Sequence, residues 1–184
     1  MLKFLKDKKI SIFFIIYFVA LFVLSTTLMP MLSLEFSKSG GFSAGADILL
    51  GSVISLGLLR GKKRASLFGM VVGFIFDVYV GNPYDFSPLI YFLCAYCANY
   101  AATPFSRKTP LSAMLVAAML VWIKSLFSFF YLIATSGESG IPTILLYGVL
   151  PEYIANVISA AICFTVMRIA MAIFRIPVKG DIGR

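Results

Sequence analysis

The chain has no histidine among its 184 residues. Histidine is the usual general acid or base near neutral pH and a common zinc ligand. Its absence argues against a histidine-based catalytic dyad and against most zinc sites. The sequence also lacks the P-loop pattern GxxxxGK[ST] that binds nucleoside triphosphates. We therefore expect a protein that is not an enzyme and has no catalytic, cofactor-binding or metal-binding residues.

Acidic residues are scarce. The chain has 8 acidic and 16 basic residues, which gives a net charge of +8. In a soluble protein such a balance would suggest nucleic acid as a partner. Here the basic residues cluster between apolar runs, so we interpret them as signals of membrane topology and as contacts to lipid headgroups. We expect a lipid bilayer as the partner of these charges, and no nucleic acid.

Cysteine is rare as well. Cys94, Cys97 and Cys163 all lie inside apolar runs. The first two match the pattern CxxC, but they sit in the middle of a hydrophobic segment. We interpret them as small apolar residues that fill space between helices.

Apolar residues make up 60% of the chain, and the mean hydropathy is +0.96. Soluble domains contain about 45–50% apolar residues. A membrane-spanning helix needs about 20 of them in a row. We therefore predict an all-α integral membrane protein with one domain over 1–184 and six transmembrane helices, at about 10–29, 45–59, 65–80, 86–103, 111–135 and 151–174. The second is short, so we expect it to be tilted, extended into the preceding loop, or shielded by protein.

The basic start and the apolar stretch that follows resemble a signal peptide. The apolar stretch is about 20 residues long, which exceeds a signal peptide's hydrophobic region, and no small-residue cleavage site follows it. We expect it to be retained as the first span.

All but two of the basic residues fall in four segments, which six spans place on one side: the N-terminus, 60–64, 104–110 and the C-terminal region. We expect 60–64 to form a tight turn between two spans. The exceptions are Lys38, on the opposite side, and Lys124, within a span. The excess of positive charge on the cytoplasmic side predicts that both termini are cytoplasmic. The chain is thus expected to be a multi-pass membrane protein.

One face of the third predicted span carries Gly69, Gly73 and Asp77 at i, i+4 and i+8. Glycines on one face allow another helix to approach closely. Gly81 begins the turn that follows, so we expect a tight hairpin between the third and fourth spans. We consider these residues candidates for helix packing within the chain or for contact with a partner.

Lys124 lies near the middle of the fifth span, where a charge costs about 2.5–3.5 kcal/mol on the insertion scale. It either forms a buried ion pair, with Asp77, Asp47 or Glu152 as partner, or reaches a wet cleft or a headgroup. Asp47 lies at the start of the second span, where a carboxylate favours the helix N-terminus.

The last region has two interpretations because Pro151 interrupts its apolar run. Either one long helix is kinked there, or a short segment at 142–149 precedes the sixth span. We favour the second. Glu152 and Asn156 then share one face of that span, at i and i+4.

The order of these motifs resembles the MreD family of bacterial rod-shape proteins. The residues that carry the resemblance are Ala46-Asp47-Ile48-Leu49-Leu50 at a span start, Gly69, Gly73, Asp77 and Gly81 at spacings of four in the hairpin, and Ile141-Pro142 followed by Glu152 and Asn156 in the last region. Ala46 stands where the family often has proline, and Asp85 where it often has glycine.

The resemblance implies a place in the bacterial cytoplasmic (inner) membrane and a fold similar to the substrate-binding S-component of energy-coupling-factor transporters. It also implies a non-enzymatic scaffold that acts with MreC, the MreB filament and the RodA–PBP2 synthase in side-wall peptidoglycan synthesis, the MreB filament being reached indirectly or through cytoplasmic loops. The alternative is an S-component that binds a vitamin.

Overall fold

The computed structural model describes residues 12–27, 46–60, 62–80, 86–101, 109–135, 141–143, 145, 149–174 and 176. Within these ranges the structure is helical and contains no strand, which confirms the all-α class. The helices are Ile12–Thr27, α2 (Ile48–Arg60), α3 (Lys62–Val80), α4 (Ser87–Ala101), α5 (Pro110–Thr135), the short α6 (Ile141–Thr143) and α7 (Leu150–Ile173).

Two of these helices are long and apolar enough to cross a membrane. They are α5, over Pro110–Phe127, and α7, over Leu150–Ile173. Four further apolar helices are shorter: Ile12–Thr27, Ile48–Arg60, Ala65–Tyr79 and Ser87–Ala98. Each coincides with a predicted span, but helix length and composition alone support crossing only for α5 and α7. Six crossings therefore stay a prediction.

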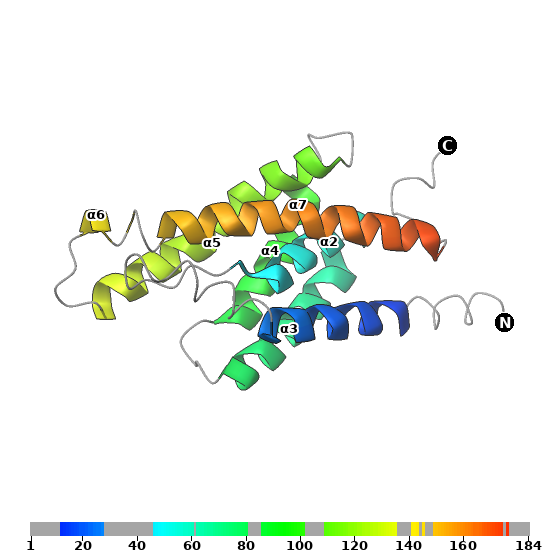
Figure 1. Cartoon of the computed structure of the whole chain (residues 1–184), viewed down its shortest axis with the longest axis horizontal. Coiled ribbons are helices and arrows are strands. Elements are labelled where there is room, and N and C mark those ends of the chain that lie inside the picture. The colour runs from blue at the N-terminus through cyan, green and yellow to red at the C-terminus, as the bar shows by residue number, and fades with distance from the viewer. Residues whose placement is uncertain are drawn as a thin grey trace.

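Helix α2 lies at the centre of the bundle. Its sequence, ILLGSVISLGLLR, has no charged residue before Arg60, so it offers no charged face to solvent. Every residue from Ile48 to Leu59 is buried, and the helix contacts α3, α4, α5 and α7 (Figure 1). We expected this short segment to be tilted, extended into the preceding loop, or shielded by protein; in the structure it is shielded by the surrounding helices.

The glycine face of α3 packs directly on α4. A Cβ added to Gly69 would lie 2.9 Å from the carbonyl oxygen of Tyr91. A Cβ added to Gly73 would lie 2.7 Å from the nitrogen of Pro88 and from the carbonyl oxygen of Ser87. These distances are too short for real side chains, so glycine is needed at both positions for the helices to approach this closely.

Two glycines of α2 also lie at close helix contacts, although the sequence pattern did not single them out. A Cβ at Gly57 would lie 2.5 Å from the carbonyl oxygen of Ala95 in α4, so glycine is needed there, and one at Gly51 would lie 3.0 Å from the Cα of Ala160 in α7, which is a tight contact. Helix α2 needs small residues because neighbouring helices pack closely against more than one of its faces.

The N-terminal helix and the end of α7 lie at the same end of the molecule (Figure 1). The rings of Phe13 and Phe174 are 4.9 Å apart between centroids, and those of Phe18 and Phe68 are 4.5 Å apart. Aromatic contacts of this kind stabilise the first helix against α7 and α3.

The basic segment 60–64 differs from the prediction. Arg60 ends α2 and Lys62 begins α3, so residues 60 and 62–64 are helical. The prediction that this whole segment forms a tight turn is therefore wrong. Lysine and arginine are good helix formers, and their long apolar stems let a helix continue beyond its apolar part.

Helix α7 begins at Leu150, with Pro151 and Glu152 in its first turn, and the short α6 precedes it. The start of α7 agrees with the start predicted for the sixth span, whereas residues 144 and 146–148 of the predicted segment at 142–149 lie outside the described residues, so the choice between the two interpretations stays a prediction. Proline suits the first turn because its missing N–H has no partner in the helix.

Candidate functional site

Lys124 of α5 lies between two carboxylates that are distant in sequence. Its Nζ is 3.0 Å from Oδ2 of Asp47 and 3.3 Å from Oε1 of Glu152. The exposed fractions of the three side chains are 22% for Lys124, 8% for Asp47 and 19% for Glu152. Two of the three partners expected for the lysine are therefore brought to it together.

Asp47 is the most heavily bonded member of this cluster. Its Oδ1 accepts a hydrogen bond from the backbone N–H of Leu50 at 2.9 Å, so it caps the N-terminus of α2. The hydroxyl of Tyr91 lies 2.8 and 2.7 Å from its two carboxylate oxygens. The backbone N–H of Asp47 donates to Oδ1 of Asn156. Asp47 thus serves both as the helix cap and as the ion-pair partner that the sequence suggested.

These five residues, which we call the charge cluster, come from separate parts of the chain: Asp47 at the start of α2, Tyr91 in α4, Lys124 in α5, and Glu152 and Asn156 at the start of α7. Two carboxylates and one ammonium give the cluster a formal charge of −1. Breaking a buried ion pair on one side leaves an uncompensated charge and costs about 3–5 kcal/mol. The cluster therefore ties four helices together.

A second contact holds α5 and α7 close to the cluster. The hydroxyl of Tyr153 donates to the carbonyl oxygen of Ala118 at 2.9 Å, and its ring meets Trp122 edge-on at 5.6 Å between centroids. Trp122 is the only tryptophan in the chain. It lies two residues before Lys124, which makes it a natural reporter of the cluster.

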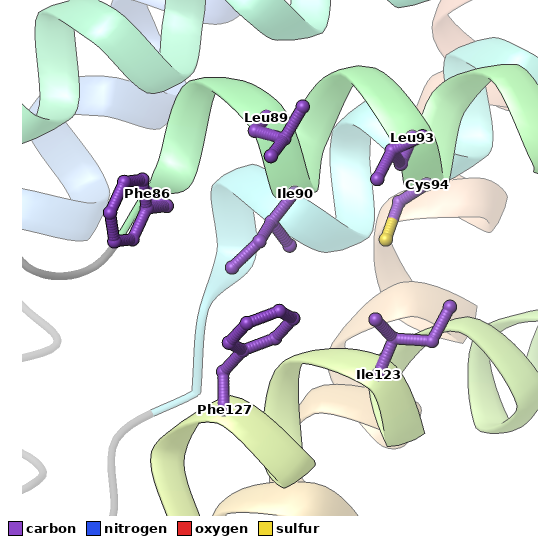
Figure 2. Close-up of a pocket in the computed structure, with 7 residues that line it drawn as sticks. All are labelled: Phe86, Leu89, Ile90, Leu93, Cys94, Ile123 and Phe127. Carbon is purple, nitrogen blue, oxygen red and sulfur yellow. The ribbon is translucent and has the colours of Figure 1, made fainter. Parts of the chain in front are cut away.

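Next to the cluster, α4 and α5 line an apolar cavity of about 190 Å³ that opens to the surface (Figure 2). Ile90 and Ile123, which line it, directly precede Tyr91 and Lys124 in sequence. The other lining residues are also apolar: Phe86, Leu89, Leu93, Cys94 and Phe127. Helices α4 and α5 are thus less closely packed here than α3 and α4 are.

The remaining candidates lie elsewhere. Gly69 and Gly73 are at the contact between α3 and α4, and the half-buried Asp77 is on the same helix. Asp77 is the expected partner that the structure does not bring to Lys124, because the lysine's two ion pairs within the described residues are to Asp47 and Glu152. Gly81 lies outside the described residues.

Sequence reasoning missed Tyr91. It is one of nine tyrosines and lies within an apolar run, so no local pattern distinguishes it. Only the approach of α4 to the start of α2 places its hydroxyl on Asp47.

The arrangement can bind helices to one another. Asp47 accepts from the lysine, the phenol and a backbone N–H, so its hydrogen-bonding capacity is largely used within the chain, whereas Glu152 accepts from the lysine. Searches with the sequence and the structure found no matching family model, curated protein or solved structure.

Proposed function

We propose that this chain is a six-span protein of the bacterial cytoplasmic membrane, with both termini in the cytoplasm. We further propose that it is a non-enzymatic, MreD-like scaffold of the rod-shape elongation complex. In this role it helps MreC and the RodA–PBP2 synthase direct side-wall peptidoglycan synthesis, and it meets the MreB filament indirectly or through cytoplasmic loops.

The membrane topology rests on the distribution of basic residues and on the shared position of two helix ends. The start of Ile12–Thr27 and the end of α7 lie at one end of the molecule, which is consistent with termini on the same side of a bilayer (Figure 1). A reporter that is active only outside the cytoplasm should be inactive when fused after Arg184. An active fusion would refute the topology.

In this topology the charge cluster lies inside the hydrocarbon layer. Helix α2 has 13 residues and rises about 20 Å from Arg60 at the cytoplasmic side. The hydrocarbon core is about 30 Å thick. The cluster at the N-terminal end of α2 would then lie several ångströms inside the outer boundary of the hydrocarbon core. An unpaired charge is costly at that depth, so the pairing of charges within the cluster stabilises the fold.

The single observation that favours a scaffold is that the buried charged side chains pair with each other between helices, whereas the outer faces are apolar. The charge cluster joins α2, α4, α5 and α7, whereas the outward face of α7 is a stripe of exposed β-branched residues: Ile154, Ile158, Ile162, Val166, Ile169 and Ile173. A similar outward face of α3 includes Val71, Phe74 and Val78. A rigid bundle with apolar outer faces is suited to binding other membrane proteins through their spans.

The alternative, a vitamin-binding S-component, requires polar groups free to recognise a small molecule. The carboxylates and the ammonium of the charge cluster are paired with each other, and the cavity beside them has an apolar lining. The geometry thus favours the scaffold. Native mass spectrometry that detects a co-purified vitamin would favour the alternative instead.

Purification of the tagged chain from native membranes tests the scaffold directly. MreC and the synthase should be recovered with it. A photo-crosslinking residue should reach such a partner from Phe74 of α3 or Ile162 of α7, which are exposed, but not from Leu56 of α2, which is buried and serves as the matched control. Recovery of neither partner would refute the proposal.

A further inference from the structure

Polar groups gather where α2 packs against α7. At one end the backbone N–H of Asp47 donates to Oδ1 of Asn156. Further along, the Sγ of Cys163 lies 3.6 Å from the carbonyl oxygen of Ile48. The hydroxyl of Ser55 is within 3.4 Å of the carbonyl oxygen of Ala160. The contact between these two helices is therefore lined in part by polar atoms.

The amide of Asn156 is incompletely paired at this contact. The residue is 1% exposed, and its Oδ1 already accepts from Asp47. Its Nδ2 carries two N–H donors, and the described part of the chain offers no acceptor for them. Buried amide donors in native proteins are almost always paired with protein or with ordered water.

We propose that the contact between α2 and α7 binds an ordered water, which accepts from Nδ2 of Asn156. A buried water needs two to four polar partners. Glu152 and Ser159, one turn before and after Asn156 on the same face of α7, can supply oxygen atoms for it.

The chemistry of the unpaired Nδ2 of Asn156 disfavours other small ligands. Nδ2 is only a donor, so it repels a metal cation. An anion is disfavoured because the adjacent charge cluster has a formal charge of −1. Water is neutral, small and able to accept. The inference rests on these contacts alone and does not depend on the scaffold function.

Water-edited solid-state NMR of the isotope-labelled wild-type chain in lipid bilayers tests this directly. Magnetisation transferred from water should reach the side-chain amide of Asn156 as fast as it reaches solvent-exposed amides. It should reach the backbone amides of Val116 and Ala117, which are buried in α5 away from this contact, much more slowly. Sequential assignment of the wild type identifies each signal, so no variant has to fold.

Transfer to the Asn156 amide that is no faster than transfer to the backbone amide of Val116 would overturn the water site. The signal of Asn156 must be resolved by its assignment from those of the other asparagines in the sequence, such as Asn99, before rates are compared.

Discussion

Replacing Lys124 with methionine should destabilise the fold more than any loss of a surface charge. The substitution keeps most of the side-chain volume but removes the ammonium, so Asp47 and Glu152 face each other without a cation between them. Breaking a buried pair in this way costs about 3–5 kcal/mol. Because Lys124 is 22% exposed, we expect the lower end, about 3 kcal/mol.

The matching assay is reversible unfolding in mixed micelles, followed by the fluorescence of Trp122. A loss of about 3 kcal/mol raises the ratio of unfolded to folded protein roughly 100-fold. Arg168→Met is the control because Arg168 is exposed on α7, far from the charge cluster in sequence. Its loss should cost less than about 1 kcal/mol.

A double-mutant cycle separates the ion pair from other effects of the substitution. Asp47→Asn keeps the size of the side chain and an oxygen that can cap α2, but it removes the charge. The double variant Asp47→Asn, Lys124→Met should be more stable than the sum of the two single losses predicts, because the second substitution removes a charge that the first left unpaired. Additive losses, or single losses below about 1 kcal/mol, would refute the reasoning.

Three further predictions use the same assay. Gly73→Leu should prevent the native contact between α3 and α4, since its Cβ would lie 2.7 Å from backbone atoms of α4, whereas Met70→Leu on the exposed side of α3 should change stability by less than about 1 kcal/mol. Tyr91→Phe should cost about 1.5–3 kcal/mol through the lost hydrogen bond to a carboxylate, and no loss would argue against that bond. Glu152→Gln should cost less than Asp47→Asn, because Glu152 is more exposed and its distance to Lys124 is longer; the reverse order would contradict the geometry.

The helical class and approximate positions of the long helices could be predicted from apolar runs, because the length and composition of such runs carry that signal. Lys124 could be recognised as a residue in need of a partner, because a charge in an apolar segment is costly. The choice among Asp77, Asp47 and Glu152 could not be made. The choice depends on which helices are neighbours, and all three carboxylates lie toward the same side of the predicted membrane topology.

Other features depend on packing that has no local signature. Gly51 and Gly57 resemble any glycines in an apolar helix until α4 and α7 are placed against α2. Tyr91 is one aromatic residue in an apolar run until α4 approaches the start of α2. The helical state of residues 62–64 was missed because charge density was interpreted as a turn, although lysine and arginine favour helices.

Depletion of the chain in the bacterium that encodes it, followed by microscopy of cell shape, tests the proposed function most directly. The scaffold proposal predicts that depleted cells become round, and that wild-type protein or Lys124→Arg restores rods better than Lys124→Met at equal expression. Cells that keep their rod shape and side-wall synthesis after complete depletion would contradict the proposal.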